Sequence, residues 1–524
     1  HNAEPIVEHI DAIVPVLAHH ADNAHVASGV CAIALNIAIV KEACPALCRQ
    51  SVVAALCRSL ERHAEDTDLC QDAVAALAHI ASLDSARDLL LAEGAVPLLL
   101  ALLRAHVGSE PICQNVCWAL RTLTNTRGAC KELWALGGAV EALCDAIEQH
   151  TDVLAVCVFC CWTLCNLFAQ SACPPGLLAS TALPAMLRAL TAHENYASLR
   201  KAVVFALCHA AAHPEAQPAL LANHVPELVM DAAAVLGDDA NVSSAAATTI
   251  KQFAATGRIG PEHVPIVMPG LLAILHDYSS NVIVSKEACM ALWYLYNPRL
   301  RQQQHHHRLQ QQQQQQQHEI EVVVGDETEA AAAAAAATAA EEDTEEPEPL
   351  RLDKYVDETV KLVLAGLNNH CQDQRYVEPA IGCLGELAQQ SAAACHTLVN
   401  MNGVPLLLSV LELYTATPMV PAVLRVLRAL LATKDNSAAC KRFVEQNGLA
   451  AVYALCAETD ADEAVVLDCI SILDSVSSSS SLLLLITPPT QRAKAQALQQ
   501  SRCCGGDAEQ SGARRWARST AAQS

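Results

Sequence analysis

The chain has 524 residues, too many for one compact core, because single cores stop growing at about 250–300 residues. Its 52% hydrophobic and 17% charged content exclude a globally disordered chain, and its 3% aromatic content favours helices over strands. The formal net charge of −23, from 33 basic and 56 acidic residues, disfavours direct binding of nucleic acid through a basic field.

One pattern recurs along the chain: a small or aromatic residue is followed, two positions later, by a leucine or isoleucine anchor in an apolar helical run. Successive anchors are 42 to 45 residues apart, and after one interruption two further intervals of 43 follow. A shared phase of about 43 residues predicts an array of stacked repeats. The anchors are Leu35, Leu77, Leu120, Leu164, Leu207, Ile250, Leu295, Leu384, Leu427 and Ile470.

Each unit also contains a turn followed by an apolar helix. Gly or Asn is expected to end one helix, and Pro fits the first turn of the next. Within the helices apolar residues recur at helical spacing, as at Leu99, Leu102 and Leu103. Each unit is therefore predicted to contain a short helix, a turn and two longer antiparallel helices. The turns lie at 93–97, 137–140, 181–184, 224–227, 402–405 and 447–449.

The run 94–99 followed by 118–123 resembles an armadillo repeat, and so does 137–140 followed by 162–167. The resemblance implies an all-α, right-handed α-solenoid of about ten armadillo-like repeats. HEAT repeats are the nearest alternative, but a three-helix unit of about 43 residues favours armadillo. We expect about seven units in residues 4–297 and about three in residues 351–476.

Two segments depart from the repeat pattern. Residues 298–350 hold His, Gln and Ala tracts and an acidic run, so this insert is expected to be disordered. It is interpreted either as a surface loop without function or as an acidic arm for a basic partner surface. The Ser-, Pro- and Arg-containing tail at 477–524 is also expected to be disordered.

The sequence lacks a Gly-rich phosphate loop, a His-Glu-x-x-His motif and a Gly-x-Ser-x-Gly motif, so we expect no enzyme, cofactor, metal site or small-molecule substrate. Most of the 24 cysteines lie in apolar helical runs and are expected to be small buried residues in a reducing compartment. No apolar run reaches 18 residues, so no membrane span is expected. The expected location is the cytoplasm, with the nucleus as a further compartment.

In armadillo arrays the third helix of each unit lines the concave side, so equivalent positions form columns. Two residues before the anchors stand Ile33, Ala75, Trp118, Trp162, Phe205, Thr248 and Trp293. Two residues after them stand Ile37, His79, Thr122, Asn166, His209, Gln252 and Asn297. The second column is polar from the second unit to the seventh. Because buried amides need partners, we interpret it as a hydrogen-bonding surface for an extended peptide; packing between repeats is the alternative.

The spacing Trp-x-x-x-Asn at 162/166 and 293/297 is similar to the peptide-binding motif of importin-α-type proteins. Basic residues after the anchors instead favour an acidic or neutral ligand, as in catenin-like arrays. The predicted function is therefore a non-catalytic scaffold that binds an extended protein segment in its groove. The alternatives are a nuclear transport adaptor and a structural part of a cytoskeletal or ciliary assembly. The predicted binding residues are Trp118, Arg121, Thr122, Trp162, Asn166, Phe205, His209, Lys251, Gln252, Trp293 and Asn297.

Overall fold

The computed structural model describes residues 10–170, 173–297, 350–414, 419–433, 437–457 and 463–478. Every regular element in these ranges is a helix. The predicted insert, apart from its last residue, and almost all of the predicted tail lie outside the described residues. The chain divides into two compact units, residues 1–236 and 237–524.

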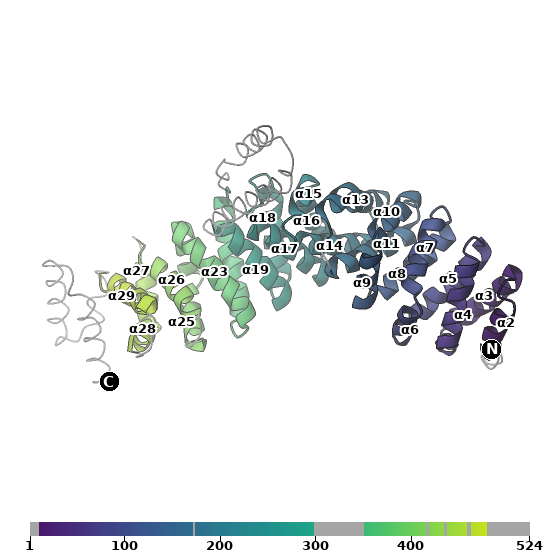
Figure 1. The fold of residues 1–524 in the computed structure, drawn as a ribbon. Coiled ribbons are helices and arrows are strands. Elements are labelled where there is room, and N and C mark those ends of the chain that lie inside the picture. Colours follow the sequence, from purple (N-terminus) through teal and green to yellow (C-terminus); the bar gives the residue numbers. More distant parts are fainter. Residues whose placement is uncertain are drawn as a thin grey trace, which may run out of the picture. The chain divides into compact units, whose positions relative to one another are not determined.

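The first unit repeats a short first helix, a second helix and a long third helix (Figure 1). Its elements are η1 (Ile10–Ala12), α2 (Ile13–His19), α3 (Ala24–Ile39), η2 (Cys44–Leu47), α4 (Gln50–Arg62), α5 (Thr67–Ala81), η3 (Asp84–Ala86), α6 (Arg87–Ala92), α7 (Ala95–Ala105), α8 (Glu110–Leu123), α9 (Arg127–Leu136), α10 (Ala139–Gln149), α11 (Leu154–Gln170), α12 (Pro175–Leu177), η4 (Leu178–Ala182), α13 (Leu183–Ala192), α14 (Ala197–Ala211), α15 (Gln217–Ala222) and α16 (Val225–Val235).

The second unit follows the same plan. Its elements are α17 (Ala240–Ala255), α18 (Val264–Asp277), α19 (Val282–Tyr296), η5 (Asp353–Tyr355), α22 (Val356–Asn369), α23 (Gln374–Gln390), α24 (Ala392–Asn400), α25 (Gly403–Leu413), α26 (Met419–Leu431), α27 (Ser437–Glu445), α28 (Gly448–Ala457) and α29 (Glu463–Ser478).

The third helices form a continuous stack within each unit. In the first unit α3, α5, α8, α11 and α14 pack side by side in this order (Figure 1). In the second unit the order is α17, α19, α23, α26 and α29. Helix α23 packs directly on α19, although 298–349 separate them in the sequence. Ten third helices in the described residues confirm the prediction of an all-α solenoid of about ten repeats.

The predicted turns before the second helices are present at most positions. Gly94 and Gly138 have φ of 71° and 64°, and Asn402 and Asn447 both have φ of 58°. These left-handed conformations suit Gly and Asn, as expected for residues that end one helix before the next begins. The turn predicted at 181–184 is wrong: the π-helical segment η4 runs into α13 without a left-handed residue. Thr and Ala at this point disfavour positive φ, and the chain continues through a π turn instead.

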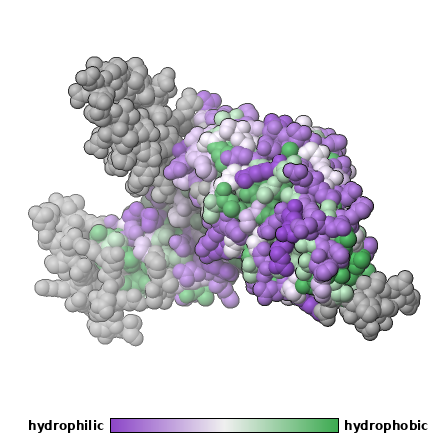
Figure 2. All heavy atoms as spheres, turned by 45° about the vertical axis from the view of Figure 1, so that its right-hand side comes forward, coloured by the Kyte–Doolittle hydropathy of each residue, from purple (hydrophilic) through white to green (hydrophobic). Residues whose placement is uncertain are grey.

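The core contains mainly Ala, Leu, Val and Cys, while hydrophilic residues cover most of the face shown in Figure 2. The described cysteines are free and mostly buried, as predicted. Several have a further role at the start of a third helix. The Cys113 thiol donates to the carbonyls of His106 and Val107, both at 3.3 Å. Burial raises the pKa of Cys113 to about 12, so this thiol keeps the proton that it donates.

A row of hydrogen bonds joins successive repeats where the second helices end, and the sequence analysis did not identify it. Each histidine at this C-cap donates from Nε2 to the carbonyl that follows the equivalent C-cap one repeat earlier, over 2.6–2.8 Å. We call the four histidines of the first unit the histidine ladder: His63, His106, His150 and His193. Their regular spacing of 43 or 44 residues was the available signal.

The second unit has histidine or tyrosine donors at the same C-cap positions. His370 donates to the Ser279 carbonyl at 2.8 Å, and the Tyr414 hydroxyl donates to the Cys371 carbonyl at 3.1 Å. The first unit ends where this position is Leu236, which has no side-chain donor. In the same register a donor at 236 would reach the Glu194 carbonyl, so the missing link lies between two repeats of the first unit.

Candidate protein-binding face

Four large rings lie on neighbouring third helices of the first unit, and each is half-buried. The Trp118 ring of α8 stacks on the Phe159 ring of α11, with centroids 6.4 Å apart and planes 21° apart. The Trp162 ring of α11 lies 5.7 Å from the Phe205 ring of α14. We call this set the aromatic face: Trp118, Phe159, Trp162 and Phe205.

Helical spacing explains why the aromatic face is continuous. Phe159 and Trp162 are three residues apart, so they are neighbours on one side of α11. The first ring meets α8 and the second meets α14. The sequence analysis missed Phe159 because the surrounding run is apolar on every side; its spacing from Trp162 was the signal that could have identified it.

Arg121 lies one turn beyond Trp118 on α8. Its guanidinium carbon is 5.9 Å from the Phe159 ring centre, a cation–π contact. Among the residues that the structure describes, Arg121 forms no ion pair. The predicted pair Trp118 and Arg121 is therefore brought together, and Phe159 completes the group.

Some side chains of the predicted polar column remain partly accessible, whereas others are hydrogen-bonded within the protein. Asn166 is half-buried and its Nδ2 donates to Thr124 Oγ1 at 3.1 Å. Thr122 is buried, and its hydroxyl donates to the Trp118 carbonyl of its own helix at 2.8 Å. His209 is half-buried; burial first, and then nearby His213, lower its pKa. Asn166 and His209 thus remain accessible in part, whereas Thr122 is satisfied inside the helix.

The seventh anchor requires a correction. The anchor follows the N-cap by eleven residues in α5, α8, α14, α17 and α23, for example from Asp66 to Leu77 and from Asp239 to Ile250. In α3 the distance from Asn23 to Leu35 is twelve, so the equivalent residue there is buried Ala34 and not half-buried Leu35. In α19 the N-cap is Asn281, so the equivalent residue is Leu292 and not Leu295. Both leucines are fully buried and one helical turn apart, so the apolar pattern alone could not distinguish them.

Trp293 and Asn297 consequently lie outside the two columns. The Trp293 ring packs over Gly382 of α23, where an added Cβ would lie 2.5 Å from Trp293 Cε2. Asn297 is buried at the C-terminal end of α19, and its Nδ2 donates to Glu386 Oε1 at 3.1 Å. Both side chains join α19 to α23.

Lys251 is engaged in an ion pair within the second unit. Its Nζ contacts Glu287 Oε2 of α19, and Lys286 reaches the other carboxylate oxygen at 3.1 Å. Burial by itself raises the pKa of Glu287, but these two ammonium groups outweigh it and leave the pKa below its ordinary value. Gln252, the next residue, is half-buried.

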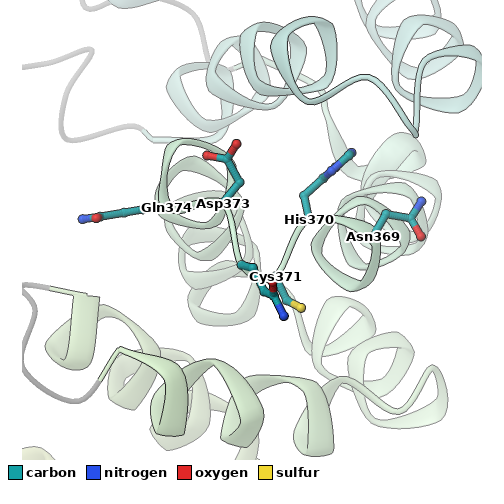
Figure 3. A pocket seen from close by; sticks show the side chains of 6 residues that line it. Asn369, His370, Cys371, Asp373 and Gln374 are labelled. Atoms are coloured by element: carbon teal, nitrogen blue, oxygen red, sulfur yellow. The ribbon is translucent and has the colours of Figure 1, made fainter.

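Other kinds of site have little support in the described residues. No group of three or more His, Cys, Asp or Glu side chains there is arranged to hold a metal ion. A cavity of about 450 Å³ lies along the loop 369–374, between the end of α22 and the start of α23 (Figure 3). Its polar side chains take part in local links: His370 and Asn369 both donate to the Ser279 carbonyl, and Asp373 caps α23.

No single helix in the described part of the chain is long and apolar enough to cross a membrane. The pair α24 and α25, bent by 82°, meets the length and composition requirement only when its two helices are combined.

Comparisons with known proteins agree with this architecture. A family model described as Armadillo/beta-catenin-like repeat matches residues 84–124, which span η3 to α8. No curated protein matches the sequence. A crystal structure of an engineered protein is similar at 19% identity and a TM-score of 0.61, covering 90% of this chain and 99% of that chain.

A second similar structure comes from work on a phosphorylation switch that controls the interaction between cadherin and beta-catenin. It shares 14% identity with this chain at a TM-score of 0.64, covering 90% of this chain and 81% of that chain. At these identities the likeness concerns the fold. With the matched repeat and the ten stacked third helices, it shows an α-solenoid of the armadillo type.

Proposed function

We propose that the protein is a non-catalytic scaffold that binds an extended segment of another protein along the third helices of its first unit. The aromatic face is the observation that carries this proposal. Half-buried Trp and Phe side chains leave apolar area for a partner, and such residues are enriched at the energetic centres of protein interfaces.

An extended segment suits the regular spacing of these helices. Packed helices lie about 8–10 Å apart, and an extended chain advances about 3.3 Å per residue. About three ligand residues would therefore pass each third helix. Asn166 uses its amide nitrogen within the protein, which leaves its carbonyl oxygen to accept a backbone N–H of the ligand. Arg121 favours an acidic side chain at the neighbouring ligand position.

The test combines crosslinking with two matched double variants. A photoreactive phenylalanine replaces Phe205 in the 524-residue chain, and crosslinked peptides from cell extract are identified by mass spectrometry. We expect crosslinks to consecutive residues of a discrete segment, at least about tenfold reduced by Trp162→Ala/Asn166→Ala. The control Leu136→Ala/Val235→Ala removes exposed apolar side chains from the first and second helices and should leave the crosslinks unchanged.

Other outcomes would contradict the proposal. Equal loss in both double variants would indicate nonspecific apolar capture, and crosslinks that persist in Trp162→Ala/Asn166→Ala would exclude the aromatic face. Crosslinked segments rich in Lys and Arg would favour the nuclear transport adaptor. We place the scaffold in the cytoplasm, with the nucleus as a further compartment, because its many buried free thiols suit a reducing environment.

A further inference from the structure

A second cavity, of about 510 Å³, lies in the second unit between the C-terminal parts of α23 and α26 and the start of α24. Its lining is polar and cationic, in contrast to the aromatic face. We call it the arginine pocket, defined by Gln389, Ser391, Arg425, Arg428, Thr433 and Ser471.

Arg425 stands where the first unit has an aromatic ring. It precedes the anchor Leu427 by two residues, as Trp118 precedes Leu120. The pattern of burial around the two positions is the same, with two buried residues on either side of a more exposed one. A cation therefore replaces an aromatic side chain at an equivalent place on the third helix.

The two arginines differ in how far their charge is compensated. Arg428 forms an ion pair with Asp468 of α29, a residue that is buried. Arg425 is exposed and has no ion pair or hydrogen bond among the described residues. Glu386, one helical turn before Gln390 on α23, accepts hydrogen bonds from Asn297 and Gln390. The pocket thus keeps one uncompensated guanidinium.

Hydroxyl groups add donors to this charge. Ser391 Oγ accepts the Ala394 N–H at 3.3 Å, so the hydroxyl proton of Ser391 can still be donated to a ligand. Ser471 lines the same cavity from α29. The site offers a fork of guanidinium N–H groups beside hydroxyl donors, which matches an anion with several oxygens.

We propose that the arginine pocket binds a phosphorylated side chain of a partner protein. A phosphoryl group carries a charge of about −1.5 to −2 and three acceptor oxygens at pH 7, whereas a carboxylate carries one charge and two oxygens. A dianion can pair with Arg425 and also share Arg428 with Asp468. A monoanion carries less charge and would bind these two arginines more weakly. The inference rests on the proposed function for the identity of its ligand, but the pocket can be tested by itself.

The experiment uses the full chain labelled with ¹⁵N-arginine and N-acetyl-O-phosphoserine N-methylamide as the probe. The Arg425 side-chain signal, assigned by its loss in Arg425→Gln, should shift saturably. Affinity measured by calorimetry should fall by about tenfold in Arg425→Gln, since charge-assisted hydrogen bonds are about twice as strong as neutral ones. Arg425→Lys keeps the charge without the fork and should give an intermediate loss.

Controls separate this site from general cation binding and from the aromatic face. Arg188→Gln removes an exposed arginine of the first unit that pairs with Glu148 and should bind the probe as the wild type does. Trp162→Ala/Asn166→Ala should also bind it normally, so failure of the scaffold proposal would not affect this result. Equal affinity of wild type and Arg425→Gln, or equal affinity for N-acetylglutamate N-methylamide, would overturn the proposal.

Discussion

The two units place different chemistry on the same helical positions. In the first unit Arg121 of α8 lies over the Phe159 ring of the next third helix. In the second unit Lys251 of α17 occupies the position of Arg121, and Glu287 of α19 occupies that of Phe159. A cation–π contact in one unit is thus an ion pair in the other. The buried anchors stay apolar in both, so the half-buried positions are free to differ between repeats.

This difference has a consequence for binding. Where a carboxylate neutralises the cation, as at Lys251, little charge is left for a ligand. Where a ring receives it, as at Arg121, both the charge and part of the ring remain available. Arg425 shows a third arrangement, a cation that has replaced the ring itself. The first unit thus offers apolar contacts to a ligand, and the second unit offers an anion site.

The largest effect on stability is expected at Gly382 in the second unit. There the Trp293 ring packs against α23, in place of a charged side chain. Gly382→Ala should destabilise the α19–α23 contact by about 1–3 kcal/mol, because its Cβ would overlap the indole ring. Hydrogen exchange of the α19 and α23 amides measures this. Gly385→Ala is the control: its nearest neighbour, Val426 Cγ2, is 3.6 Å away, so better helix propensity should stabilise it. Destabilisation by both substitutions would contradict the Trp293 explanation.

A smaller effect should distinguish the donors that join successive repeats. His106→Ala removes the donor to the Ala64 carbonyl and should cost about 1–2 kcal/mol in local stability of α7 and α8. Tyr414→Phe removes only a hydroxyl in the second unit and should cost about 0.5–1.5 kcal/mol. Urea dependence of hydrogen exchange measures both, with His25→Ala, an exposed position on α3, as the control. Unchanged exchange in His106→Ala would show that the ladder adds no stability.

The smallest effect is a pH dependence confined to the second unit. The pKa of Glu287 is lowered on folding, so its contribution is complete above the unfolded value of about 4.3 and is lost as pH falls through the folded value. Hydrogen exchange of the α17 and α19 amides, corrected for intrinsic rates, should therefore become faster below about pH 4.3. The corresponding loss of local stability should be less than about 1 kcal/mol. Glu287→Gln should remove this pH dependence. The same dependence in α8 and α11 would indicate a general acid effect instead.

Much of the repeat architecture could be predicted because its signals are local. The left-handed backbone conformation before a second helix favours Gly or Asn, as at Gly94 and Asn402. The anchors follow helical periodicity. The error at 181–184 arose because a π turn can replace that residue. The seventh anchor was misplaced because Leu292 and Leu295 both satisfy the apolar pattern, and only the position of the N-cap separates them.

The candidate site was predicted less completely because it depends on contacts between repeats. Trp118, Trp162 and Phe205 were found from their columns, but the role of Phe159 depends on which helix its ring meets. Sequence spacing could not show that Thr122 bonds within its own helix or that Lys251 meets Glu287. The partners of a half-buried side chain lie about 40 residues away, so its own segment does not specify them.

The sequence by itself determined the all-helical repeat, its period and the burial of eight of the ten anchors, because helix periodicity and turn conformations are properties of short segments. The tertiary structure decided which half-buried side chains remain open to a partner. That outcome depends on the side chain presented by the next third helix: a ring beside Arg121, a carboxylate beside Lys251, and another carboxylate beside Arg428.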